Sequence, residues 1–259
     1  MSLAPVPGRV RRRLVARTLL VAALVLTAAL GAGVAWLAVG DDAEEAALEF
    51  ALAAHDVAVE DVDGVLTVAP RGTSTAGHGV VFVPGTRIEP AAYVATWAPI
   101  VEATGVTVYL PAVPLNLPVL AGDPVGAVIE AHPERSTWIV GGHSMGGFEA
   151  AAYVATADVL PAGLLLWGSG PGRTDLADAV VPTMLVAGGS DGVLPLDRAL
   201  REGSLPPDAT IAVIDGMVHG QFGRYSDTEA PSDPSRRSDV DTLDDLVATT
   251  SGFIEQVGA

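Results

Sequence analysis

Short apolar runs alternate with amphipathic stretches along the chain from Gly79 to its end. Runs of this kind, three to five residues long and rich in Val, Ile and Leu, are typical of buried strands. They lie at residues 80–83, 106–110, 138–140, 164–167, 184–187 and 211–214. Most of the stretches between them have helical spacing, with Pro90 suited to a first turn and Ser238 to an N-cap with Asp241 three residues on. Strands that alternate with helices predict an α/β fold whose mostly parallel sheet is covered on both faces.

A hairpin is predicted before this region. The segment "VAVEDVDGVLTV", residues 57–68, has β-branched residues on either side of Asp63-Gly64. This dipeptide is favoured in two-residue hairpin turns because both positions require a positive φ.

The N-terminal 40 residues differ from the rest of the chain. Five arginines precede residue 18, residues 18–40 contain no charge over 23 positions, and Asp41-Asp42 ends the run. At 1.5 Å per residue this helix is roughly 34 Å long, enough to cross a hydrocarbon core of about 30 Å. Arginine before the span and acid after it place the N-terminus in the cytoplasm and residues 41–259 outside.

A cleaved signal peptide is the alternative for the same segment. Its apolar region is usually shorter, about 7–15 residues, although Gly33-Val34-Ala35 offers a weak small-x-small cleavage site. The chain would then be secreted. We expect the uncleaved anchor.

Four parts of the chain follow from these patterns. They are a basic cytoplasmic segment at 1–17, a transmembrane signal anchor at 18–40, an acidic helical linker at 41–56 and one catalytic domain at 57–259.

Composition excludes several functions. Cysteine is absent, so disulfides, thiolate metal sites and cysteine nucleophiles are excluded. Beyond residue 17, 9 arginines face 31 acidic residues, a net charge of 9 − 31 = −22. Such a surface repels phosphate backbones, so we expect no nucleic-acid partner. Nothing in the sequence indicates a metal or organic cofactor, and the oligomeric state is open.

The stretch "IVGGHSMGGFEAAAYVA", residues 139–155, carries the strongest chemical signal. An apolar strand runs into Gly142-His143-Ser144-Met145-Gly146, and small residues follow. The pattern G-x-S-x-G between a strand and a helix is typical of a nucleophile elbow, in which a strained turn exposes the serine. The alternative is a tight turn between strand and helix that has a structural role only. The context favours Ser144 as the nucleophile.

A serine hydroxyl needs a base to take its proton and an acid to orient that base. In proteins with a nucleophile elbow of this kind, the acid and then the histidine follow the serine along the chain, each just beyond a strand. Asp191 follows the run at 184–187, 47 residues after Ser144, and His219 follows the run at 211–214, 28 residues further on. The sequence therefore predicts a triad of Ser144, Asp191 and His219.

Other acids and histidines are weaker candidates. Fallback acids are Asp175, Asp178 and Asp215, and the remaining histidines are His55, His78, His132 and His143. Of these, His143 adjoins the serine, where packing is expected of it rather than catalysis.

The oxyanion that forms when the serine attacks a carbonyl needs backbone N–H donors. One is expected from Met145, at the start of the helix. The second is expected from the loop "VPGTRIEP", residues 83–90, where Thr86 is preferred and Arg87 is one residue away.

With these motifs in place, the chain from about Ala47 onwards resembles the α/β-hydrolase superfamily. It is similar to a bacterial branch with "VVFVPGTRIEPAAY", "VYLPAVPLNLPVL", "IVGGHSMGG", "GGSDGV" and "VHGQFG" in this order. The resemblance implies an esterase-like fold with Ser144, Asp191 and His219 as triad, and it implies no particular substrate. Pro84-Gly85 stands where many lipases have His-Gly.

Only residues 168–182 separate two predicted strands where many lipases insert a cap, so a minimal cap and an open site are expected. The apolar, proline-rich residues 111–120 either line the acyl side of the site or form a rigid loop over the core. The expected function is a membrane-anchored, extracytoplasmic serine hydrolase of small-molecule carboxylic esters or thioesters. A catalytically silent hydrolase-fold module that binds an envelope ligand is the alternative.

Overall fold

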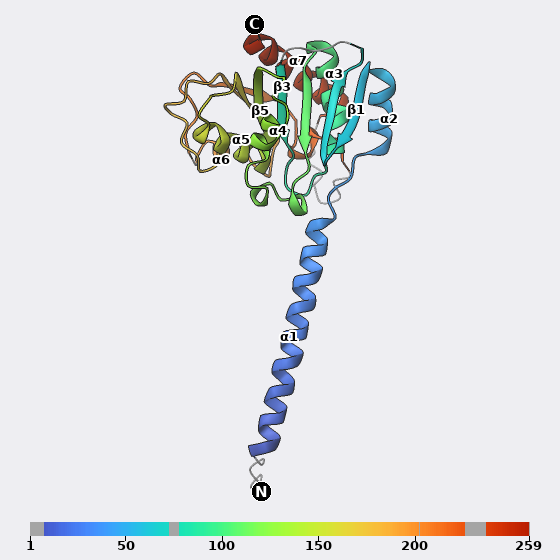
Figure 1. Ribbon diagram of the computed structural model, residues 1–259, viewed down its shortest axis with the longest axis vertical. Helices are drawn as coiled ribbons and strands as arrows, with labels where there is room; N and C mark the ends of the chain where they lie inside the picture. Colours follow the sequence, from blue (N-terminus) through green and yellow to red (C-terminus); the bar gives the residue numbers. More distant parts are fainter. Residues whose placement is uncertain (1–7, 73–77, 202, 226–236, 259) are drawn as a thin grey trace.

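The structure, a computed structural model, describes residues 8–72, 78–201, 203–225 and 237–258. A long N-terminal helix, α1 (Gly8–Ala38), projects from one side of an α/β domain, and the C-terminus lies on the opposite side (Figure 1). The remainder of the described chain forms this domain around one sheet.

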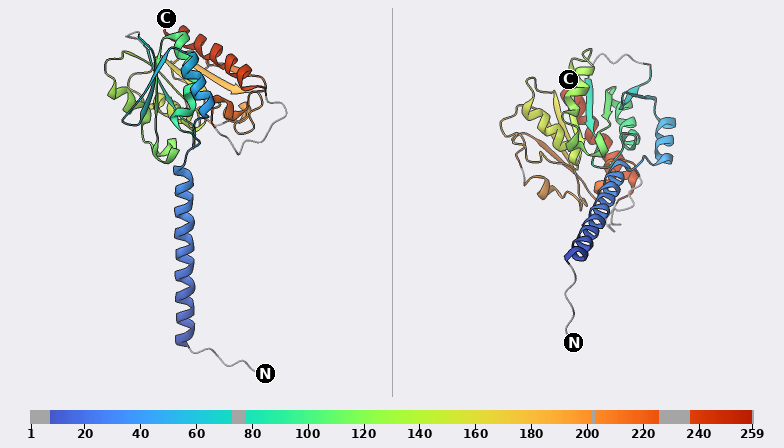
Figure 2. Two further views of the ribbon diagram at one scale, coloured as in Figure 1. Left: turned by 90° about the vertical axis from the view of Figure 1, so that its right-hand side faces the viewer. Right: turned by 60° about the horizontal axis from the view of Figure 1, so that its bottom comes forward.

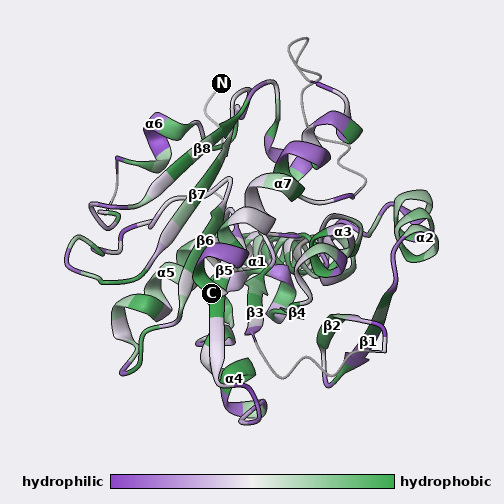
Figure 3. Ribbon diagram, turned by 90° about the horizontal axis from the view of Figure 1, so that it is seen from above, coloured by the Kyte–Doolittle hydropathy of each residue, from purple (hydrophilic) through white to green (hydrophobic). Residues whose placement is uncertain are grey.

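Eight strands form that sheet in the order β1-β2-β4-β3-β5-β6-β7-β8, which Figure 3 shows from one edge to the other. The pairs β1–β2 and β2–β4 are antiparallel, and the other five pairs are parallel. The strands are β1 (Val57–Val62), β2 (Val65–Pro70), β3 (His78–Val83), β4 (Thr107–Pro111), β5 (Thr137–His143), β6 (Gly163–Trp167), β7 (Thr183–Gly188) and β8 (Thr210–Ile214). The expected mostly parallel sheet is confirmed.

Each of the six apolar runs forms a strand. In the five inner strands, continuous Val, Ile and Leu suit positions buried on both faces, whereas β8, at the edge of the sheet, is largely exposed. The hairpin is also confirmed: β1 and β2 pair around Asp63 (φ 53°) and Gly64 (φ 79°), the left-handed positions that the Asp-Gly turn requires.

Helices cover both faces of the sheet (Figure 3). On one face are α2 (Glu45–Ala54), α3 (Val94–Thr104) and α7 (Asp239–Gly258), and on the other are α4 (Pro124–Ala131) and α5 (Met145–Thr156). The short elements are η1 (Pro90–Tyr93), η2 (Pro114–Asn116), η3 (Pro118–Leu120), α6 (Leu196–Ala199) and η4 (His219–Phe222). As predicted, Pro90 begins a helical turn, and the Ser238 hydroxyl accepts a hydrogen bond from the Asp241 N–H at 3.2 Å before α7.

The core on the α3 and α7 side is built around large aromatic rings. Trp97 and Trp167 stack with ring centroids 4.8 Å apart, and Phe82 packs edge-on against Trp97 at 5.2 Å. All three side chains are fully buried. This packing fixes α3 on the carboxyl half of β3 and β6, next to the strand ends that carry the candidate site.

Helix α1 is long and apolar enough to cross a membrane over Val15–Trp36, and none of that span is buried in the domain (Figure 2). The span was expected at residues 18–40. The helix begins earlier, at Gly8, because the arginine-rich segment is helical as well, and it ends at Ala38. Residues 1–7 of the predicted basic segment lie outside the described residues.

The cap between β6 and β7 is minimal, as expected. Residues 168–182 contain no helix or strand, and their one β-bridge joins Asp175 to Ser204. The connection between β6 and β7 therefore forms no folded lid over the carboxyl edge of the parallel strands.

Candidate active site

The turn between β5 and α5 holds Ser144 in a strained conformation. Its φ of 53° and ψ of −121° are rare for a residue with a side chain. The small neighbours make this turn possible: a Cβ on Gly142 would collide with the backbone of Gly146, and one on Gly146 with the carbonyls of Val83 and Pro84. The side chain of Ser144 remains partly exposed at the carboxyl edge of the sheet.

Neighbouring strands hold this turn in place. The Ser144 N–H donates to the Trp167 carbonyl at 3.0 Å, which continues the β5–β6 ladder to the serine itself. The hydroxyl of Ser169, just beyond β6, donates to the Ser144 carbonyl at 2.7 Å. Ser169 is buried, and sequence reasoning missed it because a serine after a strand carries no distinctive signal.

The predicted acid and base meet. His219 Nδ1 lies 2.7 Å from Asp191 Oδ2, and the two side chains are 12% and 1% exposed. The other carboxylate oxygen of Asp191 accepts the N–H groups of Val193 and Leu194, at 2.9 and 2.7 Å. Both oxygens of the buried acid are thus bonded, so its orientation toward the imidazole is fixed.

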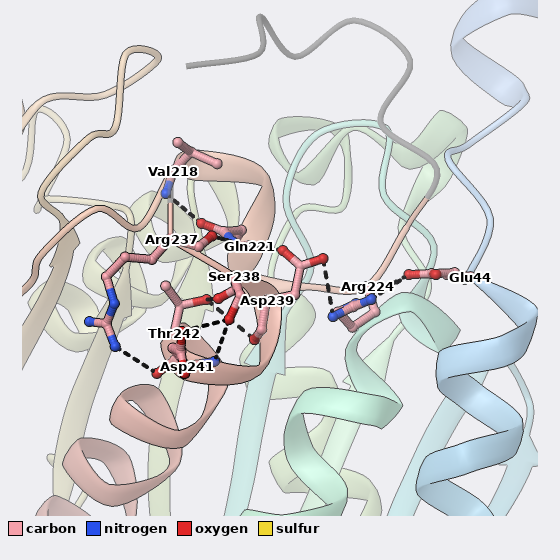
Figure 4. Close-up of polar contacts among 9 residues, drawn as sticks. All are labelled: Glu44, Val218, Gln221, Arg224, Arg237, Ser238, Asp239, Asp241 and Thr242. Carbon is pink, nitrogen blue, oxygen red and sulfur yellow. Dashed lines mark hydrogen bonds and ion pairs between the residues drawn. The ribbon is translucent and has the colours of Figure 1, made fainter. Parts of the chain in front are cut away.

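The segment that carries His219 is tied to the start of α7 (Figure 4). Gln221 Oε1 accepts the Val218 N–H at 2.9 Å, and Gln221 Nε2 donates to Asp239 Oδ1 at 2.6 Å. Arg224 then pairs with Glu44 at 2.7 Å and with Asp239 at 3.3 Å. These bonds hold η4 at the end of β8, so the imidazole stays at the edge where Ser144 lies.

The fallback acids stand apart from this arrangement. The carboxylate of Asp175 accepts the Ala177 N–H, and Asp215 is an exposed turn residue whose carbonyl accepts a hydrogen bond from Arg237. Two of the other histidines pair with exposed glutamates, His55 with Glu102 and His132 with Glu134.

In the loop after β3, two of three adjacent amides are already engaged. The Gly85 N–H donates to the Tyr93 hydroxyl at 2.9 Å, and the Arg87 N–H to the Asn116 carbonyl at 2.7 Å. Within the described part of the chain the Thr86 N–H has no acceptor, and the Thr86 hydroxyl contacts Met145 Sδ at 3.4 Å. Thr86 therefore remains the preferred donor of this loop, beside the helix start that presents the Met145 N–H.

Tyr93 and His143 lie beneath the site. The Tyr93 hydroxyl is 2.9 Å from His143 Nδ1, and the rings of His143 and His219 are 4.6 Å apart between centroids. Burial first, and then the electrostatic influence of the neighbouring His219, lower the pKa of His143 well below its usual value, so His143 stays neutral. Burial likewise raises the pKa of Tyr93. Sequence reasoning missed Tyr93, because its partner His143 is 50 residues away.

Replacing Tyr93 with phenylalanine should lower kcat roughly 10- to 100-fold with little change in KM. The substitution leaves the Gly85 N–H and the His143 nitrogen without their buried partner, a cost of about 1–3 kcal/mol, next to the proposed donor Thr86. Steady-state kinetics on a soluble ester would measure it. Tyr109→Phe is the matched control, since the buried Tyr109 hydroxyl bonds Arg135 at 2.6 Å in the other core; an equal loss of kcat in both variants would contradict this role.

The lowered pKa of His143 also predicts acid sensitivity of folding. The unfolded chain binds a proton at this histidine near pH 6.5, whereas the folded chain does not, so lowering the pH below about 6.5 favours unfolding. The free energy of unfolding should fall by up to about 1.4 kcal/mol per pH unit in this window. Urea titrations between pH 7 and 5 would show a smaller pH dependence in His143→Asn, and equal slopes would refute the assignment.

A cavity of about 320 Å³ lies between the first turns of α5 and the segment after Asp191. It is lined by Phe148, Gly172, Leu194, Arg198, Ala199 and Arg201. Leu194 lines this cavity and its N–H is hydrogen-bonded to Asp191, so the cavity lies next to the loop that carries Asp191.

Solved structures with the same fold support this description. The chain is similar to a thermophilic esterase, Est2, from Thermogutta terrifontis with butyrate bound (13% identity, TM-score 0.52, covering 78% of this chain and 95% of that one). It is also similar to Est1E from Butyrivibrio proteoclasticus (11%, TM-score 0.55, 78% and 98%). A third match is MGS-MChE2, an α/β hydrolase enzyme from a lagoon-sediment metagenome (15%, TM-score 0.56, 77% and 98%). At these identities the likeness concerns the fold.

No curated protein matches the sequence. The sequence pattern of the alpha/beta hydrolase family, in contrast, matches residues 79–240, from β3 through the strands that carry Ser144, Asp191 and His219 to the start of α7. This chain therefore belongs to the alpha/beta hydrolase family.

Proposed function

We propose that the protein is a membrane-anchored serine hydrolase that cleaves carboxylic esters or thioesters outside the cytoplasm through an acyl-enzyme on Ser144. The observation that carries the proposal is the 2.7 Å bond between His219 and the buried Asp191, at the sheet edge where the strained elbow exposes Ser144. Family membership and the esterase among the similar structures agree with it.

In the first half of the reaction, the Ser144 oxygen attacks the carbonyl carbon and its proton passes to His219 Nε2. Asp191 holds the opposite ring nitrogen and stabilises the imidazolium that forms. The C–O or C–S bond then breaks, and the leaving alcohol or thiol takes the proton from His219. In the second half, water gives a proton to His219 and its hydroxyl to the acyl carbon. The bond from this carbon to the Ser144 oxygen then breaks, the serine oxygen takes the proton back from His219, and the acid is released.

The negative charge on the carbonyl oxygen is stabilised by the N–H groups of Thr86 and Met145. Each donor of this kind contributes roughly 3–4 kcal/mol to the transition state. The Met145 N–H lies at the N-terminus of α5, where the helix dipole adds to the effect.

The contacts between α1 and the domain favour a membrane anchor that is retained after synthesis rather than a signal peptide that is cleaved off. Trp36, at the end of the span, lies under the Arg87 guanidinium at 3.7 Å from ring centroid to Cζ, and the Asn116 side chain donates to the Ala38 carbonyl at 3.3 Å. The domain thus contacts the last turn of the helix itself. Mass spectrometry of the membrane fraction should recover peptides from residues 15–36; a mature chain that begins at Trp36 would instead show cleavage after Ala35.

A serine-directed fluorophosphonate tests the proposed chemistry on the full chain in detergent. Such a probe phosphonylates only an activated serine, so the labelled peptide should contain Ser144, and labelling should compete with ester turnover. Intact, folded protein that is neither labelled nor active on a panel of esters, thioesters and lactones would identify a catalytically silent binding module instead.

A further inference from the structure

The segment that leaves α1, residues 36–44, is fixed to the edge of the sheet that carries the candidate site. The Asp41 N–H donates to the Arg87 carbonyl, and the Asp41 carbonyl accepts the Glu89 N–H at 3.2 Å. On the other side, the Glu44 N–H donates to the Arg224 carbonyl at 2.9 Å, and the two side chains form an ion pair (Figure 4). The exit segment therefore contacts both the Thr86 loop and the segment after His219.

Gly40 shows how closely this segment packs. It is buried, and a Cβ at this position would lie 2.7 Å from Asn116 Nδ2 and 2.7 Å from Glu89 Cγ. A larger residue here would require those two side chains to move. Together with the backbone pairing of Asp41, this close packing fixes the direction in which α1 leaves the domain.

That direction places α1 on the same side of the domain as the edge that carries the candidate site. The loops with Thr86, Ser144, Asp191 and His219 all follow the carboxyl ends of parallel strands, and such ends share one edge of a sheet. Because α1 meets the domain at the Thr86 loop, the site and the membrane span lie on the same side. Figures 1 and 2 show α1 leaving that side, opposite the C-terminus.

An apolar loop lies next to the exit segment. In residues 113–120, after β4, the side chains of Leu115, Val119 and Leu120 are 36%, 61% and 52% exposed. Of the two alternatives for this loop, the exposure argues against a rigid cover over the core, since only Val113 and Pro118 within residues 113–120 are buried. A wall on the acyl side of the site stays a prediction. Figures 1 and 2 both show this green loop at the rim of the domain beside the upper end of α1.

The loop is held in this position against its backbone preference. Leu115 and Asn116 both have positive φ, 55° and 53°. Non-glycine residues in this region persist only where surrounding contacts impose it. Here the contacts are the Arg87 N–H on the Asn116 carbonyl and the Asn116 side chain on α1, so the same bonds that fix the helix present Leu115 to the outside.

The two arginines at this rim are paired with acidic residues of the exit segment. Arg87 lies 3.5 Å from Asp41 and Arg224 2.7 Å from Glu44, although the domain as a whole is strongly acidic. Trp36, in this same group of contacts, is the residue type enriched at the headgroup level of bilayers. An apolar loop whose neighbouring arginines are paired, at the end of a helix long enough to cross a membrane, suits an uncharged lipid interface.

We propose that residues 113–120 rest in the headgroup region of the membrane that α1 spans, and that the site takes its ester substrates from that membrane. The substrate class is an amphiphile with its ester bond at the interface, which reaches Ser144 without crossing bulk water. The choice of substrate rests on the proposed chemistry at Ser144, whereas the orientation of the domain rests only on α1 as a retained membrane anchor.

Absence of cysteine from the chain allows a direct test of orientation. Val119→Cys, labelled with an environment-sensitive fluorophore in the full chain in phosphatidylcholine vesicles, should show blue-shifted emission and quenching by spin-labelled phosphatidylcholine. Val159→Cys is the matched control: it is 81% exposed and precedes β6, at the opposite edge of the sheet. Equal, water-like emission at both positions would overturn the proposed orientation.

The substrate is tested in the same vesicles with umbelliferyl butyrate and with an analogue that carries a long alkyl tail on the coumarin ring. The tailed ester should be cleaved at least as fast as the soluble one, and Val119→Asp with Leu120→Asp should lower the ratio of the two rates about tenfold relative to Val159→Asp. Cleavage of the soluble ester alone would refute the membrane substrate but keep the proposed function. Cleavage of neither would refute the proposed function, and with it this choice of substrate, while the fluorescence still decides the orientation.

Discussion

Ser144→Ala should lower kcat on any ester substrate on the order of 10⁶-fold, because the variant has no oxygen that can form the acyl-enzyme. Catalysis that remains would come from binding and from the donors Thr86 and Met145. The fold should be kept, since alanine fits the space of serine and the hydrogen bonds at this turn use the backbone of residue 144. The free energy of unfolding should change by less than about 1 kcal/mol.

Stopped-flow and steady-state assays on the full chain would measure this loss, with fluorophosphonate labelling as a second readout. Ser136→Ala is the matched control, because Ser136 is exposed just before β5, at the opposite end of the strand that leads to Ser144. Retained labelling and turnover in Ser144→Ala would assign the chemistry to another residue.

His219→Ala should cost a similar factor, on the order of 10⁶ in kcat, since the serine proton then has no acceptor and the leaving group no donor. Asp191→Asn should cost less, about 10⁴-fold, because the imidazole remains but its orientation and its positive charge lose their support. Asp191 also accepts the N–H groups of Val193 and Leu194, so the asparagine variant should lose some stability as well.

His132→Ala controls for a general effect of removing a histidine, since His132 pairs with the exposed Glu134 outside the site. The double variant Ser144→Ala, His219→Ala should be about as slow as either single variant if the two residues act as one unit. Multiplicative losses, or normal rates in His219→Ala, would show that His219 is not the base.

Much of the fold was predictable because the local signals agree with the tertiary structure. The six Val-, Ile- and Leu-rich runs all form strands. For five of them the reason is that a parallel strand buried on both faces needs an unbroken apolar stretch, whereas β8 is an exposed edge strand. The Asp63-Gly64 turn and the strained turn at Ser144 depend on the backbone freedom of residues that are adjacent in sequence. For the same reason a single pattern sufficed to locate the candidate nucleophile.

Pairings between distant residues could be predicted only as a set of alternatives. Several acids follow β6, β7 and β8, and the sequence ranked Asp191 first because of its place after β7. In the fold, the loop after β7 brings Asp191 to His219. In contrast, the carboxylate of Asp175 bonds within its own turn, and the carbonyl of Asp215 accepts from Arg237. The choice of Thr86 as donor also depends on a distant residue. The Arg87 N–H is already bonded to the carbonyl of Asn116, 29 residues further along the chain, which leaves the Thr86 N–H.

By itself, then, the amino-acid sequence determined what depends on neighbouring residues: the strands, the hairpin, the turn at Ser144 and the apolar length of the first helix. Tertiary structure decided what depends on residues far apart: the bond of Tyr93 to His143, the pairing of Glu44 with Arg224, and the exposure of residues 113–120 beside α1. The physical reason is that side-chain burial and backbone strain at Leu115 are set by contacts with α1 and the Thr86 loop, which no local pattern encodes.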